Sequence, residues 1–269
     1  MSASDRTPPL LAERLRRAGL DWLVPDWPVS PRIAALVTTR NGGVSAGRYA
    51  SLNLGTAGAG RAGGDTIDAV RENRRRVRAI VPADPVWLTQ VHGTAVHRVD
   101  ATGAYARESP PVADAAVTRT PGVVLAVLAA DCLPVLLADR DGGAIAVAHA
   151  GWRGLAAGVV ENALRALDVP PSRVAAWLGP AIGLGAFEVG ADVRDAFVDA
   201  CAEDAFAFAA KSGGKWQADL YALARARLAR AGVSSVHGGG ACTYSDGAQF
   251  FSYRRDGATG RMAALAWLR

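Results

Sequence analysis

Three apolar segments of strand length follow one another in the middle of the chain, at Val123–Ala130, Pro134–Ala138 and Ala144–Ala148. Short runs with almost no polar residue are typical of strands that are buried on both faces of a sheet. The last two runs are separated by residues 139–143 (DRDGG), a strong turn signal that predicts an antiparallel hairpin. The middle of the chain is therefore predicted to form a buried hairpin.

Strand and helix patterns are mixed along the rest of the chain. Further strands are expected at Ile33–Thr39, Val86–Val91, Ala95–Val99, Val174–Leu178 and Met262–Leu268. Helices are expected at 8–19, at Asp65–Ile80 with Asp65 as N-cap, and near 154–167, 190–201 and 218–231. The elements do not alternate strictly as strand, helix and strand. This order favours an α+β domain with packed sheets and outer helices over a doubly wound parallel fold.

The bulk properties narrow the class of protein. We expect the 269 residues to form one domain, with residues 1–30 as an N-terminal extension that holds a short helix. The longest apolar run is far shorter than the roughly 18 residues of a membrane span, and the N-terminus lacks a signal-peptide pattern. Three cysteines are too few for a disulfide framework, which indicates a reducing compartment. The sequence predicts a cytoplasmic protein, a monomer or weak dimer without membrane contact.

The net charge of +5 comes mostly from arginine. Excess arginine can serve nucleic acid or a phosphate-bearing substrate equally well. The one dense basic run, Arg71–Arg78, follows the apolar face of a predicted helix, so most of its arginines are expected on a solvated surface. We therefore expect no nucleic-acid partner.

Cys132 and His149 flank the predicted hairpin. Centring its turn on Arg140-Asp141 pairs these two residues across the strands, where Cβ atoms lie about 5 Å apart. That separation suits two ligands of one metal, or a thiol and its base. Alone, a buried cysteine is usually a small hydrophobe, and a histidine at a strand end is usually structural. His92, at the end of another predicted strand and directly before a glycine, is a third candidate.

These residues lie in segments that closely resemble the YfiH family, also called laccase-domain or polyphenol-oxidase-like proteins. The matching segments run in family order from about residue 33 to the end. They are 39–45 (TRNGGVS), 51–55 (SLNLG), 73–74 (NR), 90–93 (QVHG), 130–132 (ADC), 149–154 (HAGWRG), 179–182 (GPAI), 188–190 (EVG), 242–243 (CT), 250–255 (FFSYRR) and 259–261 (TGR).

The resemblance implies an αββα sandwich of two packed mixed sheets with outer helices, like the catalytic domain of cytotoxic necrotising factor. It also implies a zinc ion held by His92, Cys132 and His149, which would be the catalytic residues. Family members are described as purine nucleoside phosphorylases with adenosine deaminase activity. Their anion-binding arginines match Arg40, Arg74, Arg254 and Arg255, and the other substrate- or phosphate-binding residues expected from the matching segments are Asn53, Gln90, Asp131 and Arg153. The family often carries a cysteine within 183–186, where this chain has GLGA.

The histidine count separates the activities attached to this family. A laccase needs a mononuclear copper and a trinuclear cluster, and the chain has only four histidines, two of them committed to the proposed site. A copper polyphenol oxidase is therefore disfavoured, although one copper could occupy the zinc site as an adventitious or alternative metal. Three protein ligands and one open position are typical of catalytic zinc.

Several reactions remain open to such a zinc enzyme. Deamination needs an acid/base carboxylate, but the usual His-x-Glu deaminase signature is absent, which leaves Asp131 and Glu188 as candidates. Arginine-rich motifs favour phosphorolysis of adenosine or inosine, with nucleoside and phosphate as the small-molecule partners. The alternative is a cysteine hydrolase or amidase that uses Cys132 and His149, for example to edit a cell-wall nucleotide precursor. A pure binding role would leave the converging histidines, cysteine and arginines without a purpose.

Overall fold

A six-stranded sheet is built around the predicted hairpin. The computed structural model describes residues 11–100 and 109–269. The strand order is β11-β7-β5-β6-β3-β2, with β5 and β6 paired antiparallel at the centre. The bounds are β2 Val96–Val99, β3 Ala115–Thr118, β5 Leu133–Asp139, β6 Ile145–Ala150, β7 Val174–Leu178 and β11 Ser235–Gly238. Every residue of β5 and β6 is buried, as their unbroken apolar sequences predict.

A second, three-stranded antiparallel sheet has the order β1-β12-β4 and packs against the first. Its strands are β1 Ile33–Val37, β12 Met262–Leu268 and β4 Val124–Ala129. Between the sheets, Leu136 and Val147 from the hairpin join one buried cluster with Val127 and Ala266 from the smaller sheet. The two sheets therefore form the inner layers of the molecule.

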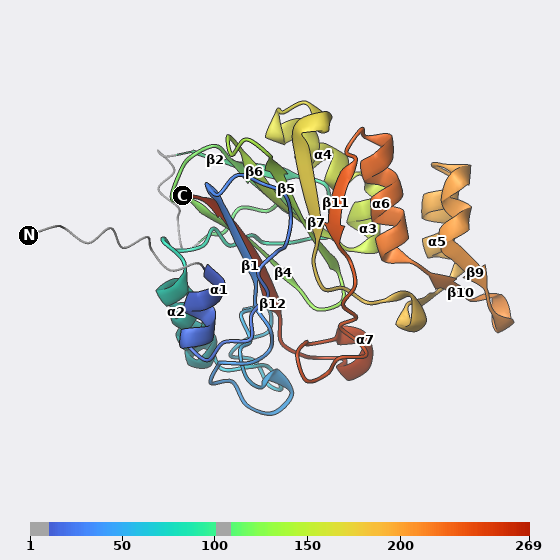
Figure 1. Ribbon diagram of the computed structural model, residues 1–269. Helices are drawn as coiled ribbons and strands as arrows, with labels where there is room; N and C mark the ends of the chain where they lie inside the picture. Colours follow the sequence, from blue (N-terminus) through green and yellow to red (C-terminus); the bar gives the residue numbers. More distant parts are fainter. Residues whose placement is uncertain (1–10, 101–108) are drawn as a thin grey trace, which may run out of the picture.

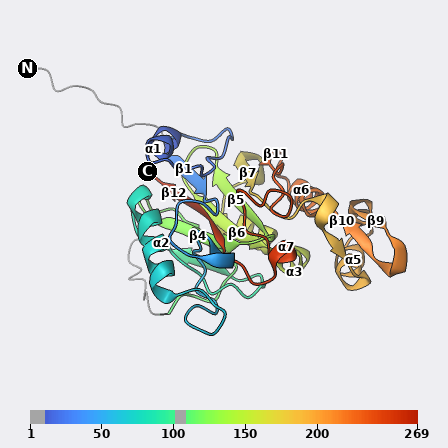
Figure 2. The ribbon, with the colours of Figure 1, turned by 90° about the horizontal axis from the view of Figure 1, so that it is seen from below.

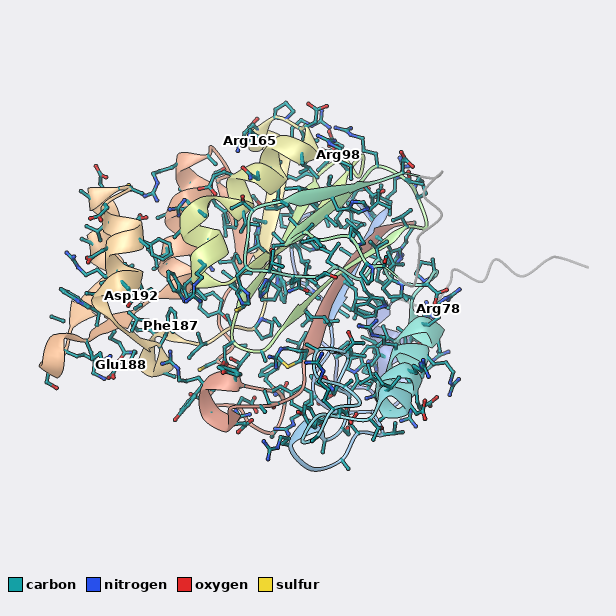
Figure 3. The ribbon with its side chains drawn as sticks, turned by 180° about the vertical axis from the view of Figure 1, so that it is seen from behind. Arg78, Arg98, Arg165, Phe187, Glu188 and Asp192 are labelled. Atoms are coloured by element: carbon teal, nitrogen blue, oxygen red, sulfur yellow. The ribbon has the colours of Figure 1, made fainter. Side chains whose placement is uncertain are left out.

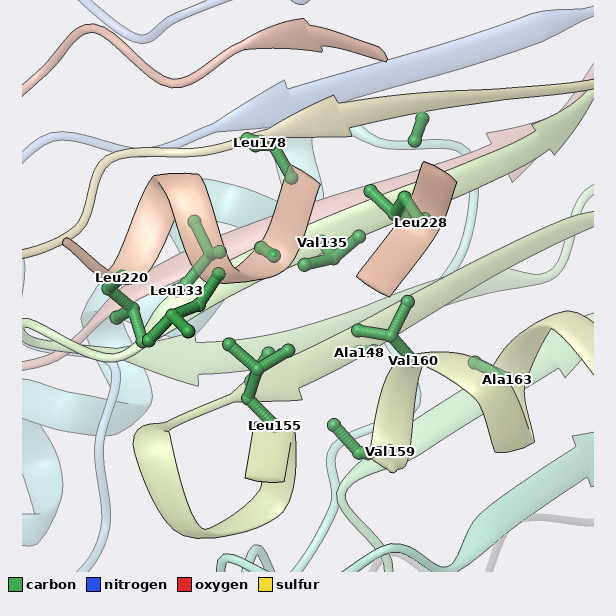
Figure 4. Close-up of a cluster of buried hydrophobic side chains, with 14 of the residues drawn as sticks. Leu133, Val135, Ala148, Leu155, Val159, Val160, Ala163, Leu178, Leu220 and Leu228 are labelled. Carbon is green, nitrogen blue, oxygen red and sulfur yellow. The ribbon is translucent and has the colours of Figure 1, made fainter. Parts of the chain in front are cut away.

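Helices cover the outer face of each sheet (Figures 1 and 2). Helices α1 (Leu11–Arg17) and α2 (Ile67–Ile80) pack on the smaller sheet through a cluster that includes Leu15, Leu36 and Val77. On the larger sheet, α3 (Trp152–Ala157), α4 (Val159–Leu167) and α6 (Leu220–Arg230) contribute to the cluster drawn in Figure 4. There Leu155, Val160 and Leu228 meet Val135, whose side chain alternates with that of Leu136 across the sheet. This is the αββα sandwich that the resemblance implies, and the prediction is confirmed. Only the larger sheet is mixed, however, because both strand pairs of the smaller sheet are antiparallel.

A third small sheet stands to one side of the sandwich, with order β8-β10-β9. It is formed by β8 Glu188–Val189, β9 Phe208–Ala210 and β10 Trp216–Ala218, and α5 (Ala191–Val198) lies next to it. These strands have only two or three residues each, too few for a periodic pattern, so the sequence did not predict them.

Local differences from the predicted elements have identifiable causes. The helix expected near 154–167 is two helices, because Gly158 adopts a left-handed conformation with φ of 96° and ends α3. Thr66 rather than Asp65 caps α2 by accepting a hydrogen bond from the Ala69 amide. Segment 86–91 makes only isolated bridges instead of a strand. The start of the helix expected at 8–19 lies outside the described residues.

In the described ranges, no helix has both the length and the apolar character that crossing a membrane requires.

Candidate metal centre

The hairpin brings Cys132 and His149 together, but with a different register from the one predicted. His149 lies in β6 opposite Pro134, two residues beyond Cys132, which directly precedes β5. The prediction that Cys132 pairs with His149 is wrong by these two residues, because a four-residue loop follows Asp139 and Gly142 takes its positive φ of 84°. A shift of two preserves the side of the sheet, so the two side chains still meet as diagonal neighbours.

His92 completes the cluster from a loop that precedes β2. The ligand atoms of His92, Cys132 and His149 all lie within 4.8 Å of one another. The Cys132 Sγ is 3.7 Å from Nε2 of His92, and the two imidazole rings meet edge to face with centroids 4.8 Å apart. His149 is buried, Cys132 is half-buried and His92 is exposed, so the cluster opens to solvent on the His92 side.

Asp114 holds the two histidines in place, and the sequence reasoning missed it. Its fully buried carboxylate accepts hydrogen bonds from the backbone amides of Val91 (3.1 Å), His92 (2.9 Å) and Gly93 (2.7 Å). It also accepts one from Nδ1 of His149 at 2.9 Å. Asp114 therefore ties the His92 loop to β6. The signal available in the sequence was a single acidic residue at the start of an apolar strand, in segment 113–117 (ADAAV).

The three side chains fit a zinc ion. An ionised carboxylate accepts hydrogen bonds and cannot donate them. Asp114 therefore fixes the proton of neutral His149 on Nδ1 and leaves Nε2 with a free lone pair. Two histidines and one cysteine form a donor set that zinc prefers, with an open fourth position. Tetrahedral zinc with ordinary bond lengths places its sulfur and nitrogen ligands about 3.6 Å apart, close to the 3.7 Å between Cys132 and His92. The site is thus a candidate metal centre.

Without a metal, the same residues form a charged pair. Burial alone would raise the pKa of the Cys132 thiol, but the charge of His149 and hydrogen bonds from both histidines lower it to about 6. Burial acts against the charged form of His149, yet the Cys132 thiolate and Asp114 raise its pKa to about 9. Between these values the pair is a thiolate and an imidazolium. A ready thiolate serves equally as a metal ligand and as a nucleophile.

A glycine makes room for the cluster. A Cβ atom added at Gly151 would lie 2.8 Å from Sγ of Cys132 and 3.0 Å from Cδ2 of His92. Gly151 has an ordinary φ of −60°, so the requirement for glycine at this position is one of space rather than of backbone conformation. Gly151 also directly precedes α3, so the start of this helix borders Cys132 and His92.

Three of the predicted anion-binding arginines direct their guanidinium groups to backbone carbonyls. Arg40 donates to the carbonyls of Ala50 and Gly247. Arg74 donates twice to the carbonyl of Leu54 and stacks on Trp87. The third of these arginines, Arg255, donates to the carbonyls of Thr243, Tyr244 and Phe250. In this arrangement Arg40 and Arg255 hold loops together, and Arg74 ties α2 to the segment at Leu54.

Arg254 and Arg153 are more exposed. The Arg254 side chain donates to the carbonyls of Ala186 and Glu188, and Arg153 stacks on its neighbour Trp152.

Asp131 lies next to Cys132 and connects the segment that precedes β5 to the C-terminal part of the chain. One carboxylate oxygen accepts from the Thr243 hydroxyl and the other from the backbone amide of Arg254, both at 2.6 Å. Arg254 lies in the short helix α7 (Tyr253–Asp256), so Asp131 anchors this helix beside the ligand loop. Asp131 has a φ of 87°, a conformation that these two hydrogen bonds help to hold.

Asn53, Gln90 and Glu188 also have protein partners. Asn53 accepts from the amides of Gly55 and Arg261, and Gln90 forms two hydrogen bonds with the backbone of Leu128. The Glu188 carboxylate pairs with Lys211. The structure therefore brings His92, Cys132 and His149 together with Asp131 beside them, and gives the other predicted residues partners elsewhere in the protein.

The fold and the cluster define an α+β sandwich protein with one candidate His–Cys–His metal centre among the described residues. The chain belongs to the YfiH family of laccase-like domains, as the sequence motifs indicate. Residues 34–269 match the family model described as multi-copper polyphenol oxidoreductase laccase. Neither His97 nor His237 lies in the cluster, so the described site offers two imidazoles to a metal.

Two similar proteins and one similar crystal structure agree with this family assignment. The chain is 51% identical to the purine nucleoside phosphorylase of Pseudomonas aeruginosa, over 92% of this chain and 98% of the relative. It is also 51% identical to purine nucleoside phosphorylase YfiH of Escherichia coli (strain K12), over 91% and 98% of the two chains. A crystal structure from Neisseria meningitidis superposes with a TM-score of 0.87 at 52% identity, covering 92% of this chain and 99% of that one.

Proposed function

We propose that this protein is a zinc-dependent purine nucleoside phosphorylase that cleaves adenosine- and inosine-type nucleosides in the cytoplasm. The observation that carries the proposal is the His92–Cys132–His149 cluster with Asp114 behind it, in a chain about half identical to proteins named purine nucleoside phosphorylase. Three unpaired cysteines agree with a reducing compartment.

The state of the carboxylates favours phosphorolysis over deamination. Phosphate is already charged at neutral pH, so it attacks the ribose C1′ without a general base. The C1′–N9 bond breaks and the departing purine takes a proton from solvent, whereas deamination needs a carboxylate that moves protons. Asp114 accepts four hydrogen bonds and is buried, and both oxygens of Asp131 are occupied. Glu188 is paired with Lys211. We therefore expect phosphorolysis to be the main reaction and adenosine deamination to be a slower side activity.

Each protein group has a defined part in this proposal. Zinc, when bound, supplies Lewis-acid stabilisation of developing negative charge. His92, Cys132 and His149 hold it, and Asp114 keeps His149 in the tautomer that can bind. The exposed edge of His92 leaves the open side of the cluster accessible to a nucleoside.

The test is release of free base from adenosine or inosine by zinc-loaded protein, with and without inorganic phosphate. We expect hypoxanthine and ribose 1-phosphate from inosine only when phosphate is present, and loss of this activity on removing zinc with a chelator. A Cys132→Ala variant serves as the control for contaminating phosphorylases. If zinc-loaded protein releases no base in phosphate, the proposed function is wrong.

One observation favours a second candidate, a cysteine hydrolase or amidase. The Cys132 thiolate and the His149 imidazolium form the ion pair that such enzymes use for nucleophilic attack. Metal content separates the two candidates, because a zinc-bound thiolate is a poor free nucleophile. A purified protein without metal whose amidase activity is lost on alkylation of Cys132 would favour this alternative.

A further inference from the structure

Arg261 is a cation beside the metal centre that no sequence argument assigned to it. It directly precedes β12, whose first residue Met262 pairs with Ala129 of β4. Continuing this antiparallel register places Arg261 next to Ala130, and the chain then runs through Asp131 to Cys132. The end of β12 nearest the ligands is therefore occupied by an arginine.

The guanidinium of Arg261 is only partly used by the protein. Its Nη1 donates to the carbonyls of Thr259 and Gly260 at 3.0 and 2.9 Å. Its Nε and Nη2 donate to no acceptor within residues 11–100 and 109–269, and neither is sealed from solvent. Arg40, Arg74 and Arg255, in contrast, direct Nε or both terminal nitrogens to protein acceptors.

Neighbouring negative charges do not satisfy these free donors. Cys132 and Asp131 are the main charges that oppose the lowering of the Arg261 pKa by burial. Yet the oxygens of Asp131 accept from Thr243 and from the Arg254 amide, not from Arg261. The structure thus holds Arg261 near Asp131 and Cys132 without pairing it to either.

The stem of Arg261 is positioned by its surroundings. A Cβ added at Gly55 would lie 2.8 Å from Cγ of Arg261, so this glycine gives the side chain its space. The Arg261 amide donates to Asn53, and the Leu54 amide donates to the Arg261 carbonyl. An arginine held in this way loses little conformational entropy when it binds a ligand.

We propose that Arg261 is the phosphate-binding residue of this site, through its free Nε and Nη2 groups. The inference rests on the proposed function for the identity of the anion, and inorganic phosphate is the probe. The planar fork matches two phosphate oxygens.

The experiment compares Arg261→Gln with wild type in zinc-loaded protein. Calorimetry measures the Kd for inorganic phosphate, and steady-state kinetics measures KM separately for phosphate and inosine. Loss of two charge-assisted hydrogen bonds should weaken phosphate binding at least about 100-fold. We expect the KM for inosine and the zinc content to remain within about twofold, a split that a general structural defect would not produce. Arg261→Lys, which keeps the charge but not the fork, should bind phosphate with intermediate affinity and provides the test if the glutamine variant does not fold.

The matched control is Arg98→Gln, which removes the same charge from an exposed site on β2; Figure 3 shows Arg98 at the top of the molecule and Phe187 and Glu188 at its lower left. It should leave phosphate binding unchanged. Unaltered phosphate affinity in both Arg261 variants, or no measurable phosphate binding by the wild type, overturns the inference. If wild type binds phosphate through Arg261 but releases no base, the proposed function fails and the inference on Arg261 stands.

Discussion

Asp114 should control both the stability of the fold and the affinity of the metal centre. In an Asp114→Asn variant, one oxygen can still accept two of the four hydrogen bonds. The amide NH2 then faces the other two donors, which are either the amides of Val91 and Gly93 or the His92 amide and His149 Nδ1. Each buried donor left without an acceptor costs about 1–3 kcal/mol, so the substitution should lower the free energy of unfolding by about 2–6 kcal/mol. Domains of this kind are stable by only about 5–15 kcal/mol in total.

The effect on metal binding follows from the same contacts. Replacing a carboxylate behind a histidine ligand typically lowers metal affinity about 10- to 100-fold. Asp114 also orders the His92 loop, so we expect the upper part of this range. Urea denaturation of the metal-free protein measures stability, and competition with a chromophoric chelator measures the zinc Kd.

Asp139 provides a matched control at the other end of the same hairpin. It is also a buried aspartate whose carboxylate accepts from backbone amides, those of Asp141 and Gly143, but it contacts no ligand. Asp139→Asn should lower stability and leave the zinc Kd within about twofold. The reasoning is refuted if Asp114→Asn binds zinc as wild type does, or if both variants weaken zinc equally.

Three further predictions concern the ligands. Cys132→Ala should lose zinc and activity together while keeping its far-ultraviolet circular dichroism spectrum; full zinc occupancy in this variant would show that Cys132 is not a ligand. In metal-free protein, iodoacetamide should alkylate Cys132 at a rate that rises with pH and is half-maximal near pH 6, because the thiolate predominates above its pKa of about 6, and zinc should protect it. Mass spectrometry reads out this reaction, and a midpoint near the ordinary value of a free thiol would contradict the pairing with His149. Gly151→Ala should weaken zinc binding at least about tenfold because the new methyl group meets Sγ of Cys132. Gly185→Ala, where an added Cβ has nothing within 4 Å, should not change the zinc Kd.

The buried hairpin was predictable because its information is local. Unbroken apolar runs predict β5 and β6, and the DRDGG segment predicts the turn between them. The register of the hairpin was not predictable, because the number of loop residues depends on how Asp139 and Gly142 arrange the turn. Cys132 and His149 were still placed together because an error of two residues keeps both on one face.

His92 and the arginines mark the limit of local reasoning. Nothing near His92 in the sequence indicates which strand its loop contacts, and Asp114, which makes that contact, lies 22 residues further along the chain. An arginine in a motif has the same sequence signature whether it binds a ligand or the carbonyls of a distant loop. Arg40 illustrates the second case, since its partner Gly247 is 207 positions away.

Two carboxylates with similar roles explain how segments so distant in sequence form one centre. Asp114 accepts hydrogen bonds from the backbone amides of the His92 loop, and Asp131 accepts one from the backbone amide of Arg254 at the start of α7. Both oxygens of each carboxylate accept hydrogen bonds from the protein, and neither carboxylate depends on a metal for its partners. The three candidate ligands are therefore held by β5, β6 and these two anchored segments without any contribution from a metal. In small zinc domains, by contrast, metal binding supplies the folding free energy. In this protein we expect the buried sheets to supply it, which would leave the candidate metal centre free to keep an open side for a ligand.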